Sequence, residues 1–151
     1  MEFSYKYIEE TDLKSCAYLF QEAFLQEPWY EEWTYHQAYE RLSELMSSKA
    51  AIGYVIYDQE KLIGMILGRR MTYLDKRQFW VDELCISQHY QGQHLGSRLL
   101  DYAKQECQKI QIYQMVLNTI RGGLSESFYH KNGFHEEKSL VCMSCDFECD
   151  K

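Results

Sequence analysis

Residues 81–100, VDELCISQHYQGQHLGSRLL, decide how the rest of this 151-residue chain is interpreted. Residues 81–86 are apolar and β-prone apart from the acidic pair Asp82 and Glu83, which predicts a buried strand. Apolar residues then recur at helical spacing from Leu95 to Cys107, which predicts an amphipathic helix. The amides of a helix's first turn lack intrahelical partners, and the helix dipole adds about half a positive charge there, so the glycine-bearing loop between strand and helix suits a phosphate group.

Two glycines alone would also fit an ordinary tight turn, but the loop resembles the acetyl-CoA motif of the GNAT superfamily of N-acetyltransferases. That motif runs Gln/Arg-x-x-Gly-x-Gly/Ala after a strand; Gln91 takes its first position, Gly96 its last, and His94 replaces the usual middle glycine. If that position requires a positive φ, His94 is strained; if it is helical, only its N–H matters. The resemblance implies that acetyl-CoA is the cofactor and that its pyrophosphate is bound by Gln91, Gly92, Gln93, His94, Leu95, Gly96 and Ser97.

Length and composition set the broad class of the protein. We expect a single N-acetyltransferase domain over residues 1–151, because this length suits one domain with a hydrophobic core. The net charge of −7 argues against nucleic acid or an anionic membrane as the main partner, and no apolar run approaches the roughly 20 residues of a membrane span. The N-terminus does not resemble a signal peptide.

The six cysteines are expected to be free thiols in a reducing cytoplasm. Several of them fall inside apolar patterns, where a thiol behaves as a small hydrophobic group. Cys142-x-x-Cys145 lies in an alternating stretch, in which residues three apart point to opposite faces. We therefore predict no metal site there.

The pattern along the chain predicts an α/β protein with a mixed sheet. Predicted strands cover residues 3–7, 51–57, 61–68, 79–86, 113–119, 134–137 and 139–147; predicted helices cover 12–24, 34–46, 95–109 and 125–132. The 113–119 strand should run parallel to its predecessor because a helix separates them. The resulting order, β-α-α-β-β-β-α-β-α-β-β, is that of the GNAT fold.

Acetyl transfer to an amine needs a base, because an alkylamine is only about one part in a thousand neutral at pH 7. Asp82 and Glu83 are the candidates, and strict alternation places them on opposite faces, Glu83 with Val81 and Cys85. The family resemblance does not decide between them. A thiolate mechanism through Cys85 is disfavoured because the two adjacent carboxylates raise the pKa of a thiol, so we expect direct attack by the amine.

Further residues would hold the thioester or protonate the leaving group. The backbone amides of Leu84, Cys85 and Ile86 can bind the thioester carbonyl and the pantetheine arm. Phe128-Tyr129-x-x-x-Gly133-Phe134 resembles a second family motif, which implies that Tyr129 is the general acid; packing between the two phenylalanines is the alternative. Asn118 resembles a family position that binds the pantetheine arm, and is otherwise an ordinary strand-end residue.

The segment of residues 26–33, QEPWYEEW, is expected to form the acceptor site, with Trp29, Tyr30, Glu31 and Glu32 in contact with substrate. It belongs to a stretch without Lys or Arg, and aromatic faces and carboxylates both favour cations; a solvated loop is the alternative. The expected function is transfer of acetyl from acetyl-CoA to a small cationic amine, such as a polyamine or an aminoglycoside. A protein N-terminal or lysine acetyltransferase and a non-catalytic acyl-CoA-binding module remain alternatives, and a homodimer remains open.

Overall fold

The computed structural model of this chain describes residues 2–149, which divide into two compact units at the Leu117–Asn118 bond. The N-terminal unit, through Leu117, holds nearly all of the regular structure. Its elements are β1 (Phe3–Tyr7), η1 (Glu10–Asp12), α1 (Leu13–Phe24), α2 (Tyr35–Met46), β2 (Ala51–Asp58), β3 (Lys61–Tyr73), β4 (Lys76–Ile86), η2 (Gln88–Tyr90), α3 (Leu95–Lys109) and β5 (Gln114–Val116). The expectation of one domain over residues 1–151 stays a prediction.

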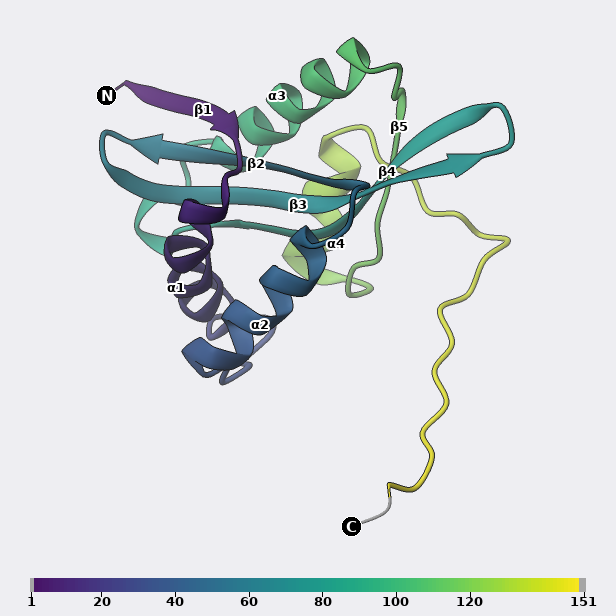
Figure 1. The fold of residues 1–151 in the computed structure, drawn as a ribbon. Helices are drawn as coiled ribbons and strands as arrows, with labels where there is room; N and C mark the ends of the chain where they lie inside the picture. The colour runs from purple at the N-terminus through teal and green to yellow at the C-terminus, as the bar shows by residue number, and fades with distance from the viewer. Residues whose placement is uncertain (1, 150–151) are drawn as a thin grey trace. The chain divides into compact units, whose positions relative to one another are not determined.

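The five strands form one mixed sheet in the order β1-β2-β3-β4-β5. The pairs β1–β2, β2–β3 and β3–β4 are antiparallel, and β5 runs parallel to β4, as predicted from the intervening helix. Figure 1 shows α1 and α2 on one face of this sheet and α3 on the other. The mixed α/β class expected from the sequence is therefore confirmed.

Helices α1, α2 and α3 form where the sequence pattern predicts them, because each has an apolar face that the sheet covers. Cys16, Ala17 and Phe20 of α1 are buried, and Leu42 of α2 packs in the same core as these residues. A capping box begins α2: Thr34 Oγ1 accepts from the Gln37 N–H at 3.1 Å, and Gln37 Oε1 accepts from the Thr34 N–H at 3.0 Å. This core fixes the two-helix layer over the strand that carries Glu83.

A β-bulge in β4 changes the register next to the acidic pair. Leu67 of β3 lies opposite Glu83, but the next residue, Gly68, lies opposite Val81, so Asp82 is the extra residue. A side chain at Gly68 could not be accommodated, because its Cβ would lie 1.9 Å from the Trp80 carbonyl oxygen. The glycine thus permits the close approach of the bulged strand.

The C-terminal unit, from Asn118, contains α4 (Gly123–Lys131), close to the predicted 125–132 helix. Gly133 has φ +90°, as expected of the residue that follows a helix. The predicted strands 134–137 and 139–147 are wrong, because these residues form no strand. Val141, Met143 and Phe147 lie at alternating positions and imitate a strand, but all three are exposed. A strand forms only where a neighbour supplies backbone partners.

Other boundaries differ at element ends. The strand predicted at 113–119 shortens to Gln114–Val116, whereas β3 extends to Tyr73 and pairs with β4 from Lys76 onward. Cross-strand pairing continues this hairpin through residues too polar to be predicted as strand. In the part of the chain that the structure describes, no helix is both long enough and apolar enough to cross a bilayer.

Candidate active site

Glu83 is a buried carboxylate on the central part of β4. Its side chain is only 6% exposed, and it lies opposite Leu67 on the sheet face that α1 and α2 cover. Burial raises the pKa of Glu83 above its ordinary value, although the adjacent Arg41 guanidinium opposes this shift. A carboxylate with a raised pKa accepts a proton more readily than an ordinary glutamate does.

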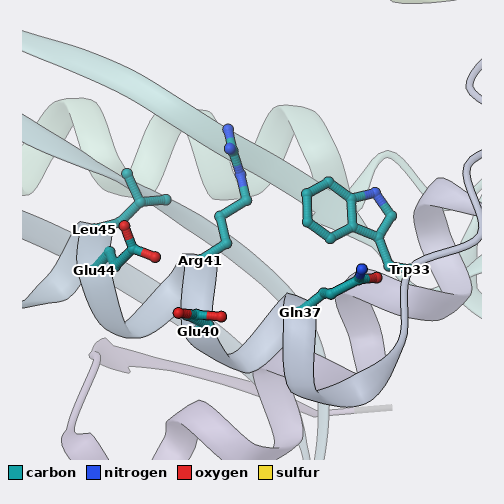
Figure 2. Close-up of a pocket in the computed structure, with 6 residues that line it drawn as sticks. All are labelled: Trp33, Gln37, Glu40, Arg41, Glu44 and Leu45. Carbon is teal, nitrogen blue, oxygen red and sulfur yellow. The ribbon is translucent and has the colours of Figure 1, made fainter. Parts of the chain in front are cut away.

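Arg41 of α2 holds this carboxylate. Its Nε donates to Glu83 Oε1 at 2.6 Å, and its guanidinium carbon lies 5.8 Å from the centre of a Trp33 ring. The arginine side chain is 46% exposed, in contrast to the buried glutamate that it binds. Arg41 also lines a pocket of about 320 Å³, which Figure 2 shows with Arg41 between Trp33 and Leu45. The pocket's remaining wall is formed by Gln37, Glu40 and Glu44.

Asp82, the other candidate base, is held by a different arginine. Arg69 of β3 donates to both of its carboxylate oxygens, from Nε at 3.0 Å and from Nη2 at 3.1 Å. The expectation that Asp82 and Glu83 follow strict alternation is wrong, because the bulge at Asp82 interrupts it. Glu83 lies on the same sheet face as Cys85. Val81 is paired with Gly68, the neighbour of Leu67, and therefore lies on the opposite face.

Cys85 lies two residues after Glu83 and is buried. Burial, followed by the negative charge of Glu83, raises the pKa of its thiol well above the ordinary value. The group therefore stays a thiol at neutral pH, which argues against an acetyl-thioester mechanism through Cys85. Cys142, Cys145 and Cys149 are free and exposed, and no group of three or more potential metal-binding side chains occurs among residues 2–149.

The edge of β4 toward β5 is open at its C-terminal end. Parallel pairing joins residues 78–80 of β4 to residues 114–116 of β5 and does not continue past Trp80 in the described chain. Backbone groups of Leu84, Cys85 and Ile86 that point toward this side are therefore not used by β5. The binding of the pantetheine arm that the sequence assigns to these residues stays a prediction.

The loop after β4 ends at an uncapped helix. His94, the N-cap of α3, has φ 59° and ψ 23°, and its side chain makes no capping hydrogen bond. The structure thus selects the first of the two readings: this position requires a positive φ, and His94 adopts it at some cost. Gly92 also has a positive φ, of 83°. Gln91, Gly92, Gln93 and His94 are exposed, Leu95 is buried, and Gly96 and Ser97 are half-buried in the first turn.

The start of this loop is anchored to α1. Glu22 Oε1 accepts from Ser87 Oγ at 3.0 Å and from the Gln88 N–H at 3.3 Å. No acidic residue occurs from Ser87 to Leu100, although the chain as a whole is acidic. Glu22 contacts only the start of the loop, and the first turn of α3 itself carries no carboxylate. The amides of that turn, which lack intrahelical partners, suit an anionic group such as a pyrophosphate.

Only part of the acidic, aromatic segment, residues 26–33, interacts with the Glu83 site. Glu31 Oε1 accepts from Trp33 Nε1 at 3.0 Å, and the charge of Glu31 contributes to the raised pKa of Glu83. Trp29 instead packs against Phe24 of α1, with ring centres 5.4 Å apart. Tyr30, with φ 49°, and Glu32 are exposed. Among the predicted acceptor residues, Glu31 is thus the one tied by contacts to the Glu83 site.

The C-terminal unit carries the remaining predicted residues. Tyr129 of α4 is half-buried, and its ring packs edge-on against Phe128 at 5.1 Å and Phe134 at 5.3 Å. Asn118 is exposed and follows β5 by two residues. The roles assigned to both from the sequence stay predictions.

Sequence reasoning missed the two arginines that pair with the acidic residues. Arg41 is a single basic residue in a helix, and nothing local connects it with Glu83, 42 positions further along. A clue did exist for the bulge, since Gly68 interrupts an otherwise β-prone run. Glu40 and Glu44, which line the pocket, were also missed because they read as the solvated face of an amphipathic helix.

Comparisons with known proteins agree with this fold. A family model described as an acetyltransferase (GNAT) domain matches residues 10–144. No curated protein matches the sequence significantly.

Three solved structures share the fold at low sequence identity. A structure of a possible acetyltransferase from Clostridium difficile 630 has a TM-score of 0.78 at 14% identity and covers 100% of both chains. A transcriptional regulator from Bacillus halodurans C-125 has a TM-score of 0.76 at 17% identity, over 97% of this chain and 100% of that one. An aminoglycoside acetyltransferase from an uncultured soil metagenomic sample, in complex with sisomicin, has a TM-score of 0.76 at 14% identity, over 97% of both chains. At these identities the likeness concerns the fold alone.

Proposed function

This chain belongs to the acetyltransferase (GNAT) family, and we propose that it transfers an acetyl group from acetyl-CoA to a primary amine of a small cationic molecule. The observation that carries the proposal is Glu83: a buried carboxylate with a raised pKa, bound by a guanidinium that lines a pocket. The Glu83 carboxylate can thus accept a proton and already binds a cationic group, the Arg41 guanidinium.

The residues present fit acetyl-CoA, which supplies an activated acetyl thioester when bound. The amides of Gln91 to Ser97 would hold its pyrophosphate, because the first turn of α3 is uncapped and its N-cap adopts the left-handed conformation. The amides of Leu84 to Ile86, on the open edge of β4, would hold the pantetheine arm and polarise the thioester carbonyl. Asn118 is a further candidate for the pantetheine arm.

Glu83 is the proposed base. It accepts a proton from the acceptor's ammonium group, which leaves a neutral nitrogen with a free electron pair for attack. Asp82 is assigned a structural role, because both of its oxygens are already bound by Arg69 within the sheet. Tyr129, whose phenol hydroxyl can donate a proton to the leaving thiolate, is the proposed acid.

The acceptor is proposed to enter the pocket lined by Trp33, Glu40 and Glu44. Its volume of about 320 Å³ lies at the lower end of the range for small-molecule sites. Carboxylates and an aromatic face favour a cation there. The aminoglycoside acetyltransferase of similar fold supports an aminoglycoside or a comparable polyamine as the acceptor class.

The test is a thiol-release assay with acetyl-CoA and a panel of acceptors: sisomicin, spermidine, and a lysine-containing peptide. We expect turnover with sisomicin, with spermidine or with both, and little turnover with the peptide. Faster turnover of the peptide would contradict a small-molecule acceptor and would indicate a protein acetyltransferase instead. Binding of acetyl-CoA without turnover on any amine would instead indicate a non-catalytic acyl-CoA-binding module.

The cofactor site has its own test. Gly96 lies in the first turn of α3, so Gly96→Leu should abolish acetyl-CoA binding in calorimetry by blocking the approach of the pyrophosphate. The fold of the variant is checked by circular dichroism. Unchanged affinity in a folded Gly96→Leu variant would contradict the assignment of this loop.

A further inference from the structure

The Glu83–Arg41 pair has an arrangement that a purely structural ion pair does not need. The carboxylate is buried, whereas the arginine that binds it is half-exposed and lines the acceptor pocket. Arg41 thus contacts both the pocket and the proposed base. An ammonium group can take its place at Glu83 Oε1 once the guanidinium moves aside.

The guanidinium occupies a ready-made cation site. One side of the site is Glu83 Oε1, at 2.6 Å from Arg41 Nε, and another is the Trp33 ring, whose centre lies 5.8 Å from the guanidinium carbon. Glu31 adds negative charge from the segment before α2, where it accepts from Trp33 Nε1. Carboxylates and an indole face attract an ammonium group by the same electrostatics as a guanidinium.

The Arg41 side chain also has an alternative carboxylate partner, Glu44, in the same pocket. Only its Nε is hydrogen-bonded to Glu83, in contrast to the two-atom contact between Arg69 and Asp82. Glu44 is three positions further along α2 and lines the same pocket, and residues three apart on a helix are neighbours. A rotation of the arginine side chain would therefore exchange one carboxylate partner for another without moving the backbone.

We propose that Arg41 is a displaceable counter-ion of Glu83, which occupies the acceptor's ammonium site in the resting enzyme and yields it to a cationic acceptor. The inference rests on the proposed function, because it assumes that Glu83 meets the acceptor. After the exchange, an N–H bond of the ammonium breaks, an O–H bond forms on Glu83, and the positive charge of Arg41 is held by Glu44. Arg41 thereby selects for acceptors cationic enough to replace a guanidinium.

The first measurement is binding of spermidine by calorimetry. Arg41→Met removes the competing guanidinium, so spermidine should bind about threefold to tenfold tighter than to the wild type, the range expected of a partly exposed cation contact. Arg77→Gln is the control, since it removes an exposed arginine charge from β4, the strand that carries Glu83, and should change affinity little. In a Glu83→Gln background the gain from Arg41→Met should disappear. Equal or weaker binding by Arg41→Met would overturn displacement.

The second measurement follows Glu83 itself by NMR titration of its carboxyl carbon. Around it lie Arg41 of α2, Asp82 and Cys85 of β4, and Glu31. Only Arg41 is positive, so Arg41→Met should raise the pKa of Glu83 further, while Arg41→Lys should restore a value close to that of the wild type. An unshifted pKa in Arg41→Met would show that Arg41 is not its counter-ion.

Neither measurement depends on acetyl transfer. If the thiol-release assay shows no turnover while spermidine still binds tighter to Arg41→Met, the proposed function fails and the counter-ion exchange stands. If turnover is found and Arg41→Met binds spermidine no better than the wild type, the exchange fails and the proposed function stands.

Discussion

Asp82 and Glu83 are adjacent in β4, and each is paired with an arginine, yet the two pairs are built differently. Arg69 belongs to the neighbouring strand β3 and contacts both oxygens of Asp82, whereas Arg41 reaches Glu83 from another layer through a single nitrogen. The exposed fractions differ as well: 19% for Asp82 and 6% for Glu83. A pair within a hydrogen-bonded ladder strengthens the sheet, and a pair between a helix side chain and a buried carboxylate can open to a ligand.

The largest expected difference between the two pairs is in turnover. Glu83→Gln should lower kcat by roughly 10²–10⁴, the usual contribution of a general base, because it removes the group that accepts the amine's proton. Asp82→Asn should lower kcat far less. The measurement is steady-state kinetics at saturating acetyl-CoA with both variants. Two small losses would mean that the amine loses its proton to bulk water.

Stability should rank the two residues in the opposite order. Asp82→Asn replaces an oxygen that accepts from Arg69 by a donor, so we expect a loss of about 1–2 kcal/mol in the free energy of unfolding. Glu83→Gln should cost less, because Gln can still accept from Arg41.

The raised pKa of Glu83 predicts how the free energy of unfolding changes with pH. Its folded-state pKa is raised, so the native state favours the protonated form, and stability falls as pH rises from the ordinary glutamate pKa through the raised one. Glu83→Gln should remove this decline, which thermal melts between pH 4 and pH 8 would show (the range covers the ordinary glutamate pKa of about 4.3). An unchanged decline would assign it to other groups.

The acidic surroundings of the Glu83 pair predict an effect on acceptor affinity. Glu31→Gln combined with Glu32→Gln should raise the acceptor KM about tenfold, because each carboxylate contact with a polyamine is worth roughly 0.5–2 kcal/mol. KM for acetyl-CoA should stay constant. Glu60→Gln combined with Asp75→Asn removes two exposed carboxylates from hairpin turns and is the control. If both double variants behave alike, the acidic segment is only a solvated loop.

The smallest effect is expected at His94, which belongs to neither pair. His94→Gly relieves a left-handed φ of 59° and should add less than about 1 kcal/mol of stability, because glycine's greater unfolded-state entropy offsets part of the gain. Affinity for acetyl-CoA should be equal or better, since only the backbone of this residue contributes. Weaker binding would give the imidazole a direct role.

Much of the fold follows from local pattern. Helical spacing from Leu95 to Cys107 fixes α3, and Thr34 with Gln37 fixes the start of α2, because these interactions lie within a few residues of each other. The loop from Gln91 to Ser97 could be located between a strand and a helix because its motif is also a local pattern of a few residues. The last two predicted strands failed because alternation shows only which faces a strand would have, and the partner that a strand requires lies elsewhere in the chain.

The sequence by itself thus determined the mixed α/β class, the strand that carries Asp82 and Glu83, and the position of the glycine-bearing loop at the start of α3. Only the tertiary structure decided which carboxylate is bound twice by its own sheet and which is buried beneath Arg41. The bulge opposite Gly68 depends on the register between β3 and β4, and the Arg41–Glu83 contact joins residues 42 positions apart. Such contacts depend on how separate elements pack together, which the periodicity of any single element does not specify.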